Sequence, residues 1–320
     1  MSEIRNKIVD LQQSMNAQIL GQEDLVDKLL ITLLADGNAL VEGAPGLAKT
    51  KAIKTLASMI KANYNRIQFT PDLLPSDITG SDIYVSSTGK FEFREGPVFA
   101  NLVLADEINR APAKVQSALL EAMAERQVSV GGKRYKLPKL FMVMATQNPI
   151  EHEGTYNLPE AQLDRFLMYI KINHPDAETE KKILRLVRNE IKEVKPNNNI
   201  EVSIDDILQA RNEALNIHMS DAIEEYLVQL IMATRNSEKY SSSLKGVIAF
   251  GASPRATLAL DRCAKINAWL KGRDFVAPED IHAVVYDVLR HRLILSFEAQ
   301  AEGITADDVI RSLLKLVPLP

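Results

Sequence analysis

The sequence predicts an α/β fold: a doubly wound parallel sheet, followed by a domain built from helices. Apolar strand-like runs alternate with helical stretches in the first half, and strands that alternate with helices form parallel sheets covered on both faces. These runs lie at residues 39–41, 66–69, 102–105, 140–145 and 167–172, with helical stretches such as 51–62 and 112–125 between them. After residue 175 the strand pattern stops, and helical patterns follow at 176–193, 203–216, 219–235, 254–271, 278–291 and 305–316. We therefore divide the chain into domains of residues 1–175 and 176–320.

Three further stretches complete the first domain. Residues 1–35 carry apolar positions at helical spacing, interrupted by Gly21-Gln22. Residues 81–85 and 90–94, around Thr88-Gly89, have the pattern of a β-hairpin. Residues 127–130 and 133–137, around Gly131-Gly132, predict a second hairpin. Two hairpins therefore interrupt the alternation of strands and helices.

The composition narrows the class of protein. The 320 residues carry 38 Lys and Arg against 42 Asp and Glu, a net charge of −4, which argues against nucleic acid as the main partner. Cys263 is the single cysteine, so no disulfide forms within the chain. The apolar runs are shorter than the ~20 residues of a membrane span, and the five histidines lack metal-ligand spacing. We expect an intracellular, cytoplasmic protein without a membrane span.

A glycine-rich loop is the most informative motif. It follows the strand at 39–41, opens onto a helix, and reads Gly43, Ala44, Pro45, Gly46, Leu47, Ala48, Lys49, Thr50. Such a loop points backbone N–H groups at phosphate oxygens, with Lys49 reaching the β- and γ-phosphates and Thr50 binding Mg²⁺. Ala48 replaces the second glycine of the usual pattern, so we expect this position not to need a positive φ. The loop predicts ATP binding.

An acidic pair ends the strand at 102–105. Because ligands of open α/β sheets bind beyond the carboxyl ends of the strands, Asp106 and Glu107 should face the phosphate loop. We assign Asp106 to Mg²⁺, and Glu107 to the general base that orients the attacking water. Loop and carboxylates together predict Mg²⁺-dependent ATP hydrolysis.

Three polar residues follow with two interpretations each. Asn148, beyond the next strand, either contacts the γ-phosphate or the lytic water, or forms an Asx-turn before Pro149. Arg165, before the last strand, and Arg255, at the start of a helix, either form surface ion pairs or neutralise transition-state charge. Their roles stay open on the residues alone.

Taken together, these motifs resemble those of AAA+ ATPases, and more narrowly those of the MoxR family. Gly21-Gln22, the phosphate loop, Asp106-Glu107, Asn148, Arg165 and Ser253-Pro254-Arg255 come in the AAA+ order. The narrower similarity lies in Leu74–Gly80, Phe91–Pro97, Ala105–Ala111 and Ala145–Pro149. It covers nearly the whole chain, and an alanine at the position of Ala48 is typical of the family.

The resemblance implies an AAA+ core and a helical lid that assemble into a ring, usually a hexamer. Arg165 would be the arginine finger acting on the neighbour's nucleotide, Asn148 sensor 1 and Arg255 sensor 2, in cis or in trans. Gln22 would lie near the adenine, or merely in a turn between helices. The hairpins would be insertions that line the central channel.

The resemblance also implies a chaperone-like remodelling or maturation factor for a protein client. Partners of the family often carry von Willebrand factor A domains. The alternative is a nucleic-acid motor or initiator, which the basic residues Lys133, Arg134 and Lys136 support locally.

Overall fold

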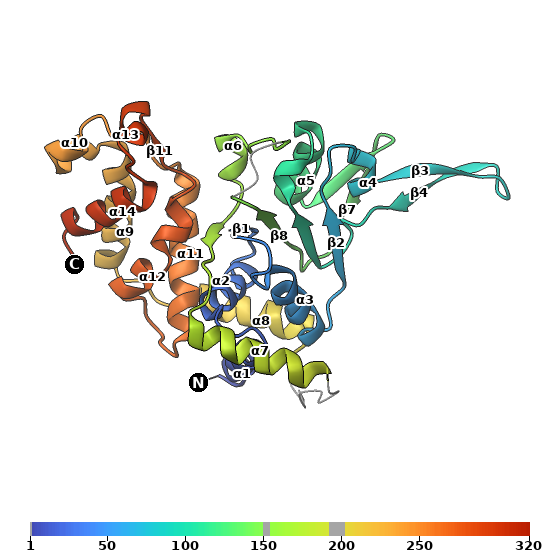
Figure 1. Cartoon of the computed structure of the whole chain (residues 1–320), viewed down its shortest axis with the longest axis horizontal. Coiled ribbons are helices and arrows are strands. Elements are labelled where there is room, and N and C mark those ends of the chain that lie inside the picture. Colours follow the sequence, from blue (N-terminus) through green and yellow to red (C-terminus); the bar gives the residue numbers. More distant parts are fainter. Residues whose placement is uncertain (1, 150–153, 192–201) are drawn as a thin grey trace.

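The computed structural model describes residues 2–149, 154–191 and 202–320, and its first half is built on a five-stranded parallel sheet (Figure 1). The strand order is β2-β5-β8-β1-β9, and all four neighbouring pairs are parallel. The strands are β1 (Ala39–Glu42), β2 (Tyr64–Gln68), β5 (Leu102–Asp106), β8 (Met142–Gln147) and β9 (Met168–Lys171). The predicted doubly wound sheet is confirmed.

Alternate residues of the central strands enter two different apolar cores. In β5, Leu102 and Leu104 pack with the helices on one face, while Val103 and Ala105 pack with those on the other. Successive side chains of a strand point to opposite faces, which is why these strands are apolar up to the polar residues at their carboxyl ends. The first face is covered by α1 (Glu3–Gln18), α2 (Glu23–Leu34) and α3 (Lys49–Met59), and the second by α5 (Ala113–Glu125).

Both predicted hairpins are present. β3 (Gly80–Val85) pairs with β4 (Lys90–Glu95), and β6 (Gln127–Val130) pairs with β7 (Lys133–Lys136). The β3–β4 hairpin reaches far beyond the rest of the molecule (Figure 1). Its base is fixed by Phe93, which stacks on Tyr135 of β7 with ring centroids 3.9 Å apart. Short helical turns lie at α4 (Pro75–Thr79), η1 (Ile108–Arg110) and α6 (Glu160–Leu163).

In the described part of the second half, residues 177–191 and 202–320, helices predominate and one small sheet is present. Its elements are α7 (Ala177–Ile191), α8 (Ile204–Leu215), α9 (Asp221–Arg235), α10 (Ser237–Tyr240), η2 (Ser242–Leu244), α11 (Pro254–Leu270), α12 (Pro278–Leu289), α13 (Phe297–Ala301) and α14 (Ala306–Leu316). The expectation that no strand follows residue 175 is wrong, because β10 (Ile248–Phe250) pairs antiparallel with β11 (Ile294–Leu295). Strands of three and two residues are too short to show an alternating pattern.

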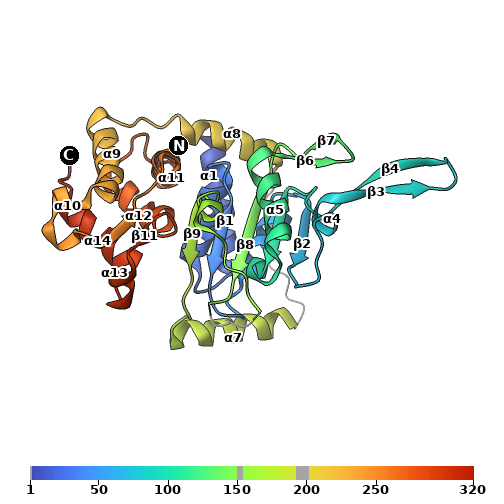
Figure 2. The same ribbon diagram turned by 90° about the horizontal axis from the view of Figure 1, so that it is seen from above.

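The helices α9 to α14, which we call the lid, lie beside β9, while the β3–β4 hairpin lies at the far end of the sheet, beyond β2 (Figure 2). Helix α8 contacts α1 and α2 as well as α11 of the lid. The domain boundary at residues 175–176 therefore stays a prediction. Across the described residues, no helix has the length and apolarity needed to span a membrane.

Candidate nucleotide site

The phosphate loop and the acidic pair meet at one edge of the sheet. The loop follows β1, Asp106 ends β5, and Asn148 follows β8. The register pairs Glu42 with Gln147 across β1 and β8, so these strands end side by side. Parallel strands bring their carboxyl ends to the same edge, which assembles the site from segments far apart in sequence.

Lys49 lies at the centre of this edge. It is the first residue of α3, and its Nζ donates to the carbonyl oxygen of Gly43 at 2.6 Å. Burial lowers the pKa of Lys49, and the negative charges of Asp106, Glu107 and Glu42 partly offset that shift. Lys49 therefore lies within electrostatic reach of both carboxylates.

The loop needs its special residues for different reasons. Gly46 has a φ of 86°, which glycine adopts without cost. At Gly43 a Cβ would lie 2.3 Å from Cγ1 of Ile172, so the close approach of the residue directly after β9 demands glycine. The expectation for Ala48 is wrong: its φ is 56°, in the left-handed region, directly before α3. Alanine there costs about 1 kcal/mol relative to glycine.

Asp106 is held by two neighbours that the sequence did not single out. Thr146 Oγ1 donates to its Oδ1 at 2.6 Å, and Arg66 of β2 donates to its Oδ2 from Nε at 3.0 Å and from Nη2 at 2.7 Å. A carboxylate at a strand end and the hydroxyl of Thr50 next to Lys49 are hard oxygen ligands, the type that Mg²⁺ prefers. The residues present therefore fit a bound Mg²⁺.

Glu107 is placed by a strained backbone and a second set of partners. Its φ is 55°, and its N–H donates to Thr146 Oγ1 at 2.9 Å, so one threonine contacts both acidic residues. Its Oε2 accepts from Gln68 Nε2 at 2.9 Å and lies 3.2 Å from Nε of Arg110. Arg66 and Gln68 stand two apart on β2, so their side chains point to the same face, and the register places Gln68 opposite Asp106 at the end of β5. Polar residues at alternate positions in a strand are the signal that could have revealed them.

Asn148 and Gln22 are both buried. Asn148 follows β8 at the edge that carries Glu107. Gln22 directly precedes α2, and its Nε2 donates to the carbonyl oxygen of Asn173, beyond β9, at 3.1 Å. The predicted contact of Gln22 with adenine stays a prediction.

The two candidate arginines lie together, but at the opposite edge of the sheet, where the parallel strands begin. Arg165 precedes β9, where Leu167 N donates to Asn38 O just before β1. About five residues of extended strand separate this point from the phosphate loop, on the order of 15 Å. Arg255 lies near Arg165, because its Nη1 is 3.4 Å from Oδ2 of the preceding residue, Asp164. The structure thus brings the arginines to each other and not to Lys49.

A cavity of about 290 Å³ opens at this second edge. Its charged lining residues are Asp36, Arg126, Asp164, Arg165, Arg255, Arg262 and Arg292. Arg126 pairs with Asp36, and Arg292 pairs with Asp164. Five arginines against two aspartates give the cavity a positive balance that suits a polyanion.

Comparison with known proteins agrees with this arrangement. Residues 38–168 match the family described as "ATPase family associated with various cellular activities (AAA)", and residues 244–313 match the AAA lid domain. The chain is 47% identical to the chaperone MoxR1 of Mycobacterium tuberculosis over 94% of this chain and 79% of that protein. It is 31% identical to the protein MoxR of Paracoccus denitrificans over 100% of this chain and 98% of that one.

A solved structure is similar over almost the whole chain. It is that of a proposed ATPase from Cytophaga hutchinsonii, with a TM-score of 0.91 and 45% identity, covering 99% of this chain and 96% of that one. The likeness therefore extends from the sheet into the lid.

Proposed function

The chain belongs to the MoxR family of AAA+ ATPases, and on that premise we propose that it hydrolyses ATP in a ring, usually a hexamer, to remodel or mature a protein client. One observation carries this proposal: phosphate loop and carboxylates share one edge of the sheet, while two arginines share the other. A ring of identical subunits places the second edge of one copy against the first edge of the next.

The loop edge supplies binding and the base. Backbone N–H groups of residues 43, 44 and 46–50 and the Lys49 ammonium hold the triphosphate, and Thr50 and Asp106 hold Mg²⁺; Pro45 has no N–H to donate. When bound, Mg²⁺ neutralises charge on the phosphate oxygens. Glu107 orients the attacking water and accepts its proton, and the buried Asn148 contacts the γ-phosphate or that water.

Charge for the transition state comes from the neighbour. Because Arg165 and Arg255 lie away from their own loop, we assign both to the nucleotide of the adjacent subunit, in trans. The test is to mix two inactive variants. Lys49→Ala subunits, the arginine donors, keep both arginines; Arg165→Ala subunits, the nucleotide donors, keep the phosphate loop. Mixed rings should regain part of the ATPase activity. No recovery at any ratio, with co-assembly shown by native mass spectrometry, would contradict a ring site.

The β3–β4 hairpin is the proposed contact with the client. Tyr84 and Phe91 pack edge to face near its end, with centroids 5.5 Å apart, and both are largely exposed. Phe93 is not available for such contact, since it stacks on Tyr135. Exposed apolar groups on a projecting element suit a partly unfolded polypeptide. A Glu107→Gln protein should hold ATP and client together, so a pull-down with it, probed for von Willebrand factor A-domain proteins, identifies the partner.

A nucleic-acid client is the competing outcome. Lys133, Arg134 and Lys136 are exposed on β7 and could contact phosphates. If DNA at physiological salt stimulates the ATPase and candidate A-domain partners do not, the protein-remodelling proposal is wrong. Replacing these three residues by serine removes the basic surface of β7 and leaves the apolar surface at Tyr84 and Phe91 unchanged, so the contributions of the two surfaces can be measured separately.

A further inference from the structure

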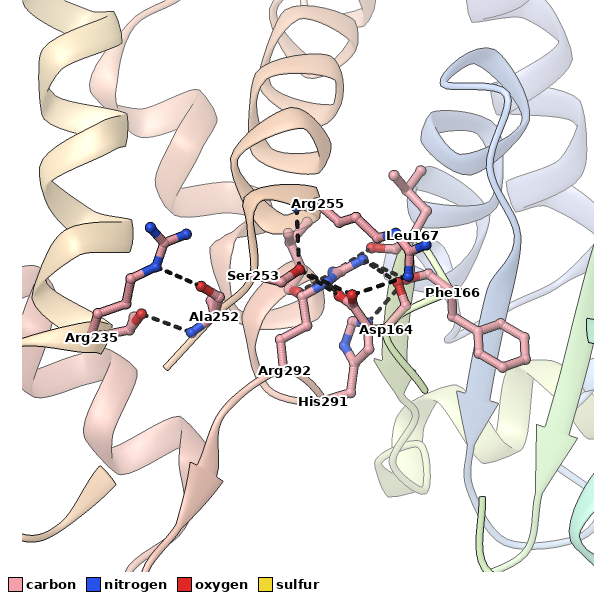
Figure 3. A network of polar contacts seen from close by, with 11 residues as sticks. Asp164, Phe166, Leu167, Arg235, Ala252, Ser253, Arg255, His291 and Arg292 are labelled. Atoms are coloured by element: carbon pink, nitrogen blue, oxygen red, sulfur yellow. Dashed lines mark hydrogen bonds and ion pairs between the residues drawn. The ribbon is translucent and has the colours of Figure 1, made fainter. Parts of the chain in front are cut away.

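Asp164, the residue before Arg165, is a meeting point of the core and the lid (Figure 3). Its carboxylate accepts from Ser253 Oγ at 3.0 Å and from Arg292 Nε at 2.8 Å, and lies 3.4 Å from Arg255 Nη1. Ser253 and Arg255 lie at the start of α11, whereas Arg292 follows α12. One carboxylate therefore holds two separate lid segments against the chain at Arg165.

Arg292 also holds the backbone on the other side of Arg165. It donates from Nη2 to the carbonyl oxygen of Phe166 at 2.6 Å and from Nη1 to that of Leu167 at 3.1 Å. His291 Nε2 lies 3.1 Å from the same Phe166 oxygen. Only 3% of the Arg292 side chain is exposed. The planar guanidinium forks onto residues 164, 166 and 167, and so fixes the segment that carries Arg165.

The contact of Asp164 with Arg255 is of a different kind. Its N–O distance is 3.4 Å, and 62% of the Arg255 side chain is exposed. Exposed pairs of this geometry contribute about 0–1 kcal/mol. A phosphate carries more charge than a carboxylate and offers more oxygens, so it can take Arg255 from Asp164 at little cost. Arg292 is the fixed partner of Asp164, and Arg255 is the exchangeable one.

We propose that Asp164 and Arg292 are positioning residues for ATP hydrolysis in the adjacent subunit: together they fix the backbone of Arg165 to the lid, and Asp164 holds Arg255 until the neighbour's phosphate accepts it. Neither residue touches the nucleotide. A movement of the lid is then passed directly to the arginine finger of the same subunit. The inference rests on the trans site proposed above.

Arg292→Lys is the sharpest test, because lysine keeps the charge but lacks the fork. The change is placed either in the arginine donor, as Lys49→Ala/Arg292→Lys mixed with Arg165→Ala, or in the nucleotide donor, as Lys49→Ala mixed with Arg165→Ala/Arg292→Lys. Phosphate release from Mg-ATP is compared with that of the unmodified mixture. We expect about a tenfold or greater loss of kcat in the first mixture, with KM for ATP unchanged, and little loss in the second.

Arg273→Lys is the matched control, since Arg273 pairs with the buried Asp280 elsewhere in the lid. This change should have the same effect on phosphate release whether it is placed in the arginine donor or in the nucleotide donor. Equal losses from Arg292→Lys in both donors would mean that Arg292 is merely structural, and would overturn the inference while leaving the trans site intact. If Arg292→Lys does not assemble, Asp164→Asn, which keeps the shape but removes the charge, is tested for the same asymmetry. If the unmodified mixture shows no recovery, the trans site fails, and this inference with it.

Discussion

Arg66 donates from two nitrogens to one oxygen of Asp106, at 3.0 and 2.7 Å, and so places a cation against the carboxylate assigned to Mg²⁺. The arginine side chain is 49% exposed, and the carboxylate is 13% exposed. A half-exposed pair of this kind is worth about 1 kcal/mol at most, so Mg²⁺ can displace the guanidinium. On the proposed assignment of Asp106 to Mg²⁺, we expect Arg66 and the metal ion to compete for this carboxylate.

Arg66→Ala should lower the Mg²⁺ concentration needed for ATP binding. Removing a competitor worth up to about 1 kcal/mol shifts the half-saturating Mg²⁺ concentration up to about fivefold downward. A Mg²⁺ titration of fluorescent ATP binding measures this shift. Arg311→Ala, which removes a surface arginine of α14 paired with Asp308, is the control. A higher Mg²⁺ requirement for Arg66→Ala would mean that Arg66 helps to hold the nucleotide itself.

Ala48→Gly should stabilise the protein. Alanine at φ 56° carries strain that glycine relieves, so the free energy of unfolding should rise by about 1 kcal/mol. Ala52→Gly is the matched control: Ala52 is buried within α3, and glycine there should lower the free energy of unfolding by about 1 kcal/mol. Denaturant unfolding measures both. Two changes of the same sign would contradict the strain assigned to Ala48.

The sheet and its loop edge were predictable because they depend on local patterns. The central parallel strands β1, β5 and β8 begin with three or four apolar residues, and the residues that end or follow each strand must meet at one edge. That argument alone places Lys49 with Asp106 and Glu107. The helices after residue 175 were also predictable, because their apolar residues recur at helical spacing. The strands β10 and β11 are too short to show an alternating pattern.

The surroundings of the carboxylates depend on strand order, which the sequence does not state. Arg66 and Gln68 become relevant only because β2 lies beside β5, across a crossover. Ala48 was misjudged because its φ follows from the loop as a whole. The meeting of Arg255 with Asp164 depends on where the lid docks, and 91 residues separate the two.

Acidification should weaken the joint between lid and core through His291. Burial, followed by the charges of Arg292 and Arg290, holds the pKa of His291 well below 6.5. The folded state therefore keeps the ring neutral, while the unfolded chain takes up a proton as the pH falls below about 6.5. This contribution to stability is complete above that pH and is lost as the pH falls toward the folded-state pKa.

His291→Gln separates this effect from general acid unfolding. Glutamine can still donate to the Phe166 carbonyl, but it does not titrate. Between about pH 7.5 and 5.5, the wild-type protein should lose roughly 1 kcal/mol more of its unfolding free energy than the variant, as followed by urea unfolding. Parallel curves for the two proteins would show that His291 does not stay neutral when the chain is folded.

Glu107→Gln is the measurement that tests the central assignment most directly. Glutamine keeps the shape and the neighbours of Glu107 but cannot accept the proton of the attacking water. ATP binding should match wild type, while Mg²⁺-dependent phosphate release falls about a hundredfold or more; Glu302→Gln on the lid surface should change neither. Phosphate release at the wild-type rate by Glu107→Gln would contradict the site proposed at this edge of the sheet.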